Sequence, residues 1–424
     1  GSNCSTFGYQ ASSSSATVSN EITLGNSDIT KFRIPGINWS IKDTTATEDY
    51  VLTVDANGEA GWEAAGGGGA SDINGLSDGV TNSSGVTVGL GTDALANDDG
   101  TANQNTALGY QSLKAMTSGN NNVGIGYRAG TAVTTGPESV IIGHNAAASS
   151  GTGIRNNVII GNKAGLSTSS DYSVYIGDLA GQGGSGNFNT AVGRYAMYAS
   201  GTGANNVAVG NISGFSITDG SYNVLMGVDS GRNITTGNNQ TAIGYTAGYS
   251  MTTGNDNTVL GKAAGYYITT GYDSVAVGSG AGYNHTTGFG NVFVGKNAGY
   301  GAGSVASSGN VGIGEETLYN QSGGYGNVCV GRESGKAITS GNSNTFIGNL
   351  VNNSQTTTGS NNITLGANST ASSATVSNEV TFGNSSIASI RCQVQTISSL
   401  SDRRDKKDIE ELPLGIDFIN ALKP

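Results

Sequence analysis

A short phrase of polar, apolar, variable, apolar and glycine residues recurs along most of the chain. Residues 122–126 read Asn-Val-Gly-Ile-Gly, and residues 206–210 read Asn-Val-Ala-Val-Gly. The glycines that close the phrases follow one another most often at intervals of 17 residues. They are Gly89, Gly109, Gly126, Gly143, Gly161, Gly177, Gly193, Gly210, Gly227, Gly244, Gly261, Gly278, Gly295, Gly314, Gly331, Gly348, Gly366 and Gly383. A fixed period over so much of a chain predicts a solenoid of stacked coils.

Each repeat predicts a coil made of strands and turns. The two apolar residues of a phrase, such as Val123 and Ile125, are two positions apart and therefore share one face of a strand. A glycine follows at once, so we expect two short strands, two turns and no helix in 17 residues. A small residue, such as Ala129 or Ala247, lies three positions after most closing glycines. With Val, Ile and Leu, these small residues predict a thin apolar stripe directed inward.

The polar residue four positions before a closing glycine predicts an internal ladder. It is asparagine at Asn105, Asn122, Asn157, Asn189, Asn206, Asn223, Asn257, Asn291, Asn310, Asn327, Asn344 and Asn362. Stacked amides can hydrogen-bond from coil to coil along the axis. The alternative is that asparagine is used here only because it favours turns.

The thin apolar stripe also predicts association. One narrow solenoid would leave part of its apolar surface in water, whereas three chains around a common axis would cover it. A stripe of Ala and Gly would let the chains approach closely. We therefore expect an all-β, left-handed parallel β-solenoid, or β-roll, in a homotrimeric rod. At roughly 4.8 Å per coil, 17 intervals give a length of about 80 Å.

The repeats resemble a known family. Residues 206–210, and Asn-Val-Gly-Ile-Gly-Tyr-Arg-Ala-Gly at 122–130, are similar to the head repeats of trimeric autotransporter adhesins. That resemblance implies left-handed parallel β-rolls, three to a head. The repeat is longer here than in the familiar adhesin head, which predicts an extended turn.

Composition excludes several other classes. The 424 residues include 70 Gly without a three-residue period, so the chain is not collagen. The net charge is −11 and the basic residues form no stripe, which disfavours nucleic-acid binding. Cys4, Cys329 and Cys392 are too scattered for a disulfide framework or a metal site, and His144 and His285 are far apart. We expect no cofactor, no metal and no membrane insertion, because no apolar run approaches spanning length.

The flanks divide the chain into further segments, and we expect it to be a piece of a longer protein. Residues 1–25 are predicted as the end of a preceding β-roll cassette and residues 26–65 as a β-hairpin connector with Asn57-Gly58 at its turn. A Gly-rich linker and lead-in spans 66–85, and the repeat β-roll spans 86–383. A neck strand is expected over 384–400, and another domain begins at 401–424.

Three features of the repeats are candidates for binding. Tyr249, Tyr266, Tyr283 and Tyr300 recur at one register, with Phe215 in the same register, and predict a stacked column. The column could face a glycan, or its rings could stack on one another to seal a turn or a subunit seam. Thr-Thr pairs at 235–236, 252–253, 269–270 and 286–287 resemble the flat rows of threonine on ice-binding solenoids, but they lie in turns. Asp219, Asp256 and Asp273 lie singly in turns and make no dense calcium cluster.

The C-terminal segment differs from the repeats. Residues 401–409 read Ser-Asp-Arg-Arg-Asp-Lys-Lys-Asp-Ile, a charge cluster not seen earlier in the chain. Ser401-Asp402, Arg404, Lys406 and Ile409 resemble the entry of the endosialidase-type intramolecular chaperones of phage tailspikes and fibres. That family implies a chaperone that trimerises, templates the stalk and is then cut off at the Ser401–Asp402 bond. A serine hydroxyl can act as nucleophile when a base such as Lys406 takes its proton; the alternative is a solvated charged linker.

These features predict a structural and receptor-binding segment of a trimeric phage tail fibre. We expect it in the virion, outside the cell, with a host surface glycan or protein and other tail proteins as partners. No turnover active site is expected, only a single self-cleavage at Ser401–Asp402. The alternatives are a bacterial trimeric surface adhesin, a glycan-degrading tailspike and an ice-binding solenoid.

Overall fold

The computed structural model describes residues 3–8, 11, 22–24, 50–54, 60–64, 79–81 and 87–391, except 101–102, 152, 200, 304 and 355–357 within the last range. The chain forms two compact units, Gly1–Ala70 and Ser71–Pro424.

The first unit contains one pair of parallel strands and one hairpin. Strand β1 (Ser5–Phe7) pairs in parallel with β2 (Ile22–Leu24), and Ser5 lies opposite Ile22, one 17-residue coil later. This confirms repeat fragments at the N-terminus. Strands β3 (Tyr50–Val54) and β4 (Ala60–Ala64) are antiparallel, which confirms the predicted hairpin. Asn57 and Gly58, expected at its turn, lie outside the described residues.

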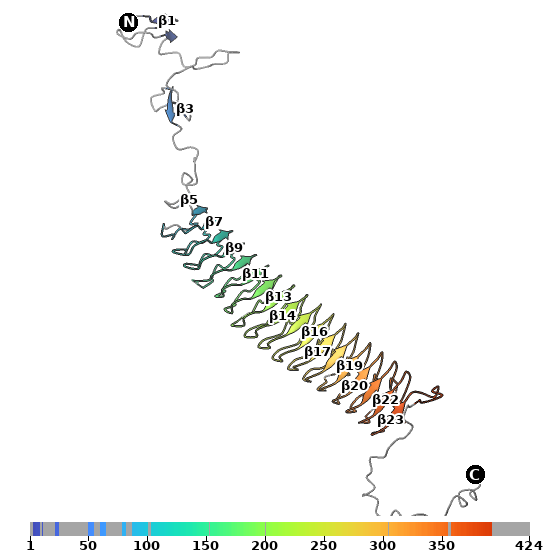
Figure 1. Ribbon diagram of the computed structural model, residues 1–424. Helices are drawn as coiled ribbons and strands as arrows, with labels where there is room; N and C mark the ends of the chain where they lie inside the picture. The colour runs from blue at the N-terminus through green and yellow to red at the C-terminus, as the bar shows by residue number, and fades with distance from the viewer. Residues whose placement is uncertain are drawn as a thin grey trace, which may run out of the picture. The chain divides into compact units, whose positions relative to one another are not determined.

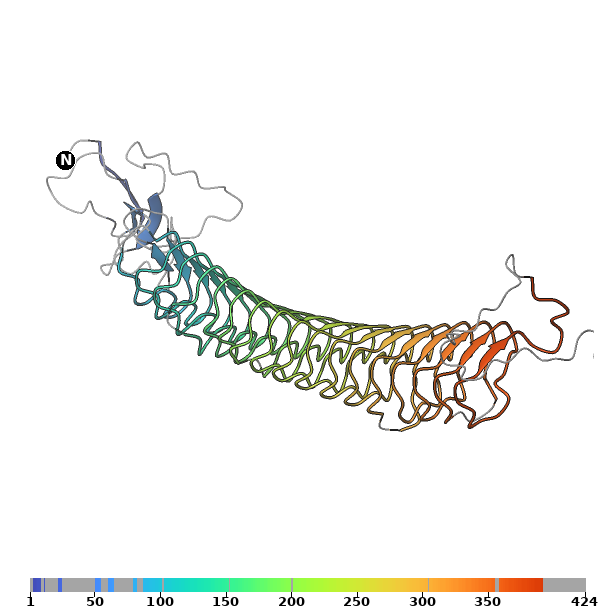
Figure 2. The same cartoon turned by 60° about the horizontal axis from the view of Figure 1, so that its bottom comes forward.

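The second unit is a parallel β-solenoid (Figure 1). It starts with β5 (Gly79–Thr81), which pairs antiparallel with β6 (Val88–Leu90). Every later strand pairs in parallel with the strand of the preceding coil. These strands are β7 Thr106–Leu108, β8 Val123–Ile125, β9 Val140–Ile142, β10 Val158–Ile160, β11 Val174–Ile176, β12 Thr190–Val192, β13 Val207–Val209, β14 Val224–Met226, β15 Thr241–Ile243, β16 Thr258–Leu260, β17 Val275–Val277, β18 Val292–Val294, β19 Val311–Ile313, β20 Val328–Val330, β21 Thr345–Ile347, β22 Ile363–Leu365 and β23 Val380–Phe382. Figure 2 shows the strands stacked along one side of the solenoid.

Each coil has one three-residue strand, not the two that the sequence predicted. The rest of the coil is turned by residues with left-handed backbone angles, which end extended structure. In the coil between Gly109 and Gly126 these are Gln111 (φ 54°), Leu113 (φ 48°) and Asn121 (φ 57°). The same positions are left-handed in most later coils.

The closing glycines are required by both conformation and space. From Gly91 to Gly366 they have φ between 120° and 141°, a region that side chains disfavour. A Cβ on Gly210 would lie 2.3 Å from the carbonyl oxygen of Gly227 in the next coil. Gly91 occupies this position in the first parallel coil, because Val88–Leu90 pairs with Thr106–Leu108. The sequence assignment of Gly89 was therefore wrong by two residues, and Gly89 is the central residue of β6.

The orientation of the strand residues differs from the expected inward stripe. The central residue of each strand points into the coil, as Ile141, Leu225 and Phe293 do with no more than 1% exposure. Val123 and Ile125 share a face, as predicted, but that face is the outer one, and both side chains are partly exposed. Two-residue alternation identifies residues on a common face without saying which face is inside.

The small residues after the closing glycines lie inside the coil. Ala129, Ala247 and Ala298 are completely buried within a single chain. The following glycine is equally confined: a Cβ on Gly130 would lie 2.7 Å from Leu113 Cδ2. The expectation that this stripe allows chains to approach one another is therefore wrong, since the stripe leaves room for core side chains of its own coil.

The predicted asparagine ladder is confirmed. Asn206 Nδ2 donates to Asn189 Oδ1 at 3.2 Å and to the carbonyl of Gly220 at 2.9 Å. Asn206 Oδ1 in turn accepts the backbone N–H of Asn223 at 3.0 Å. Asn189, Asn206 and Asn223 are at most 1% exposed. The ladder therefore satisfies buried backbone groups in every coil it reaches, which turn preference alone does not explain.

Candidate binding surfaces

The predicted tyrosine column exists. Successive ring centroids of Tyr249, Tyr266, Tyr283 and Tyr300 are 4.9, 5.3 and 4.8 Å apart. The first and last of these pairs are within 2° of parallel. All four side chains are half-buried. Burial, with smaller contributions from neighbouring tyrosines, raises the pKa of Tyr266 and Tyr283 above the ordinary value. Because each ring face is covered by the next ring, the column offers mainly ring edges and hydroxyls to a ligand.

The column is longer than the sequence analysis proposed. Tyr198 stacks on Phe215 at 5.1 Å, and the guanidinium of Arg232 lies 5.8 Å from the ring of Phe215 and 5.6 Å from that of Tyr249. Tyr319 continues the column beyond Tyr300 at 5.0 Å. Counting five residues from each closing glycine would have found all of these positions. Arg232 replaces a ring without breaking the column, because a guanidinium stacks on aromatic faces.

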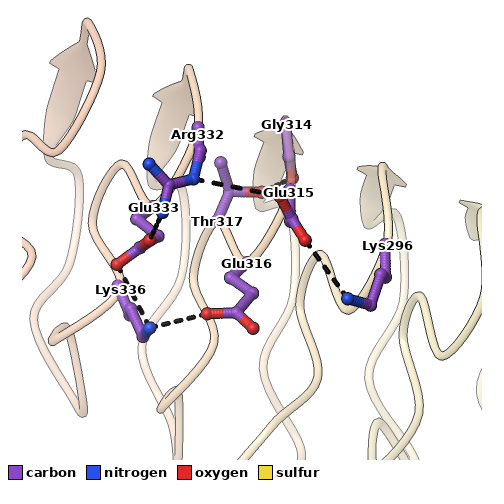
Figure 3. A network of polar contacts seen from close by, with 8 residues as sticks. All are labelled: Lys296, Gly314, Glu315, Glu316, Thr317, Arg332, Glu333 and Lys336. Atoms are coloured by element: carbon purple, nitrogen blue, oxygen red, sulfur yellow. Dashed lines mark hydrogen bonds and ion pairs between the residues drawn. The ribbon is translucent and has the colours of Figure 1, made fainter.

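Charged side chains tie three neighbouring coils together at the other end of this column (Figure 3). Glu315 lies 3.3 Å from Lys296 in the preceding coil and 3.8 Å from Arg332 in the following coil. Lys336 contacts Glu316 at 2.6 Å and Glu333 at 3.2 Å. The hydrogen bond from Lys336 lowers the pKa of Glu316, and the same contact raises the pKa of Lys336.

The threonine pairs use their first hydroxyl within the solenoid. Thr235 Oγ1 donates to the carbonyl of Thr252 at 3.3 Å, and Thr252 Oγ1 donates to that of Thr269 at 3.1 Å. The second threonine of each pair, such as Thr236, is exposed. Half of the threonine rank is therefore engaged in coil stacking, which weakens the ice-binding alternative.

The outer strand face is apolar along the whole solenoid. Its first strand position is Val, Thr or Ile from β6 to β23, and its third position is Val, Ile, Leu, Met or Phe. Exposure at the third position reaches 45% at Leu108, 44% at Ile347 and 58% at Phe382. A largely apolar sheet face of this extent is a candidate interaction surface.

The predicted cleavage residues Ser401, Asp402 and Lys406 lie outside the described residues. The expected neck strand is not seen at Ile387–Arg391, and the rest of it, from 392 to 400, also lies outside them. In the described part of the chain no cluster of three or more His, Cys, Asp or Glu side chains could hold a metal ion. Asp219 instead accepts a hydrogen bond from Thr202 Oγ1, which lowers the pKa of its carboxyl group.

The described residues contain no helix with the length and apolar character needed to cross a membrane. Comparisons with protein-family models, with curated proteins and with solved structures gave no match to this chain.

Proposed function

We propose that this chain is a structural and receptor-binding segment of a trimeric phage tail fibre, in which three solenoids pack around one axis. The observation that carries the proposal is the apolar outer face of β6 to β23. In a single chain it leaves side chains such as Leu108 and Ile347 more than 40% exposed. A surface covered by other chains would remove them from water, and each 100 Å² of apolar area covered contributes about 2.5 kcal/mol.

The threefold symmetry, the left-handed sense of the coils and the virion location rest on the two resemblances in the sequence. The solenoid is compatible with a tail fibre, an adhesin head or a tailspike. The tail fibre is preferred because Ser401-Asp402, Arg404, Lys406 and Ile409 resemble the chaperone entry. Self-cleavage at Ser401–Asp402 would mature the fibre, with Ser401 as nucleophile and Lys406 as the base that takes its proton.

The assembly is tested by placing a charge on the outer face. Ile243→Lys puts an ammonium at the third position of β15, where it would be buried between chains at a cost of several kcal/mol. We expect the variant to have the mass of a monomer in solution where the wild type has the mass of a trimer. The dissociation constant of the trimer should rise on the order of a hundredfold or more. Thr236→Lys, on an exposed turn, is the matched control and should remain trimeric. A wild-type chain that is monomeric by analytical ultracentrifugation would overturn the proposal.

The maturation step is tested on the chain with its natural C-terminal extension. Ser401→Ala should abolish cleavage without loss of the trimer, whereas Ser399→Ala should be cut like the wild type. Intact-mass measurement locates the cut. A wild type that stays uncut, or a Ser401→Ala variant that is still cut, would remove the tail-fibre interpretation and favour an adhesin head.

A further inference from the structure

One turn position of the coil changes from small polar residues to aromatic ones over a few coils, and its equivalent residues in successive coils are called a turn column here. Asn238 and Asn255 occupy this position in two successive coils. Elsewhere in this column a side-chain oxygen accepts the backbone N–H of the coil before it, as Asn255 does for Asn238 at 2.8 Å. At the next two positions the column carries Tyr272 and Phe289, whose rings stack at 5.0 Å and 4°. These two residues form a parallel bridge, so their backbones are in direct register.

The aromatic column then misses one ring. Gly309 N–H donates to the carbonyl of Phe289 at 2.9 Å, and Gly326 N–H donates to that of Ser308 at 3.2 Å. Phe289, Ser308 and Tyr325 therefore occupy the same position in three successive coils. Ser308 Oγ accepts the N–H of Phe289 at 3.1 Å, so this short side chain lies against the backbone. Two aromatic residues are left two coils apart, or about 9.6 Å, with no ring at the position between them.

A cavity of about 530 Å³ is present at this gap. Its lining residues are Phe289, Ala306, Ser308, Gly309, Gly324, Tyr325 and Gly326. Phe289 is 47% exposed and Tyr325 is 62% exposed, so both rings are accessible from solvent. The volume lies in the range of small-molecule sites.

The glycines beside the rings enlarge the gap without being required by the fold. Gly309 and Gly326 have φ of 64° and 65°, which non-glycine residues adopt at the same place in other coils, such as Asn205 (φ 59°) and Asn361 (φ 57°). A Cβ on Gly309 would come no nearer than 3.9 Å to any atom outside its chain neighbours. Packing would therefore accept a side chain there, and its absence leaves open space next to the aromatic walls.

We propose that this slot, defined by Phe289, Ser308, Gly309 and Tyr325, binds one uncharged pyranose unit of a carbohydrate. A pyranose ring presents C–H groups on both faces, suited to two aromatic walls, and hydroxyls around its edge. None of the lining side chains is charged, which matches a neutral sugar and disfavours an acidic one. The hydroxyls of Ser308 and Tyr325 supply polar contacts for the sugar hydroxyls, and a purely aromatic ligand would use neither.

This inference deepens the proposed receptor-binding function and differs from the tyrosine column that the sequence singled out. In that column every ring face is covered by a neighbouring ring or cation, from Tyr249 through Tyr300. At the slot the faces of Phe289 and Tyr325 toward Ser308 have no such neighbour among the described residues. A missing ring in a column is therefore the better candidate for carbohydrate stacking.

The test uses the full 424-residue chain and a panel of methyl pyranosides of glucose, galactose, mannose and N-acetylglucosamine, measured by saturation-transfer NMR and titration. At least one sugar should bind, and Phe289→Ala or Tyr325→Ala should weaken it about tenfold. Ser308→Tyr, which inserts the missing ring, and Gly309→Asn, which fills the space, should abolish binding while circular dichroism and thermal melting show a folded solenoid. Tyr222→Ala, another exposed ring at 62%, is the control and should bind like the wild type.

The outcomes separate this inference from the proposed function. No binding to any neutral sugar, binding unchanged by Ser308→Tyr, or tighter binding of indole or glucuronate than of every neutral sugar would overturn the inference. The oligomeric state is measured on the same samples. A trimer that binds no sugar contradicts only the slot, and a monomer that binds sugar through Phe289 and Tyr325 contradicts only the trimeric fibre.

Discussion

The outer strand face and the turn columns are built on opposite rules. On the strand face the residue class is the same in every coil from β6 to β23, apolar or threonine throughout. In the turn columns the residue class changes every few coils, from aromatic at Tyr300 to charged at Lys336. A uniform face can be covered by any apolar surface of equal length. A column whose residues change can bind a specific ligand only at the coils that carry the matching residues.

This difference bears on how identical chains would align. Sliding one uniform apolar face along another by one coil leaves nearly the same contacts, so the strand face by itself cannot set the register between chains. The turn columns differ from coil to coil, but the ring stacks and ion pairs described for them join successive coils of the same chain. A device outside the solenoid that fixes the start of the stack would resolve this ambiguity, which is the role that the C-terminal resemblance implies.

The largest predicted loss of stability comes from substituting a closing glycine, a residue that is the same in every coil. In Gly210→Ala the Cβ would lie 2.3 Å from the Gly227 carbonyl oxygen, at a φ of 141°. The backbone would have to shift, and we expect a loss of stability on the order of 4 kcal/mol or more. Gly153→Ala is the control, because its Cβ would come no closer than 3.7 Å, to Thr135 Oγ1. Chemical denaturation should show a large shift for Gly210→Ala alone, and equal stability of the two variants would contradict the steric argument.

An intermediate effect on stability is expected at His285, a buried residue at a core position that differs between coils. His285 is 3% exposed, its Nδ1 lies 3.0 Å from Ser307 Oγ, and burial lowers its pKa to about 4. The unfolded chain, with a histidine pKa near 6.5, binds this proton more readily than the folded one. The stabilising effect of a neutral His285 is therefore complete above pH 6.5 and falls by about 3 kcal/mol as the pH drops to 4.

The measurement is thermal melting as a function of pH. His285→Ile places in this core column the residue found at Ile268 and Ile234, and should remove the loss between pH 6.5 and 4. His144→Gln, at an exposed turn, serves as the matched control and should keep the wild-type pH profile. An unchanged profile in His285→Ile would assign the acid sensitivity to other groups.

The smallest effect is expected at the ion pairs of Glu315, which directly follows the closing Gly314. Glu315→Gln removes the contacts to Lys296 and Arg332, whose side chains are 63% and 55% exposed. Exposed pairs contribute little, so we expect a loss of about 0.5 kcal/mol at low salt that disappears at 1 M salt. Lys262→Gln, at the equivalent position directly after the closing Gly261, should change stability less than Glu315→Gln. A loss that persists at high salt would mean that Glu315 acts through packing.

The sequence allowed the local chemistry of a coil to be predicted but not its orientation. The Asn206 ladder and the Tyr249 to Tyr300 column followed from the period alone, because stacked coils place equivalent residues in contact. The direction of Val123 and Ile125 was inverted, since alternation is symmetric between the two faces of a strand. The extension at Arg232 was missed because a cation there takes the place of a ring. The extension at Tyr319 was missed because it follows Tyr300 by 19 residues, whereas the other tyrosines of the column recur every 17.

The sequence by itself determined that the chain winds in coils of about 17 residues with asparagine inside them, because a repeated phrase must contact its own copy. Only the tertiary structure decided that the central residue of each strand fills the interior, while the first and third residues face outward. The inward direction depends on which side chains fit between the turns formed by residues with left-handed backbone angles. This constraint is three-dimensional and cannot be read from the sequence of one repeat. The gap between Phe289 and Tyr325 arises in the same way, because residues 36 apart become neighbours only when the coils are stacked.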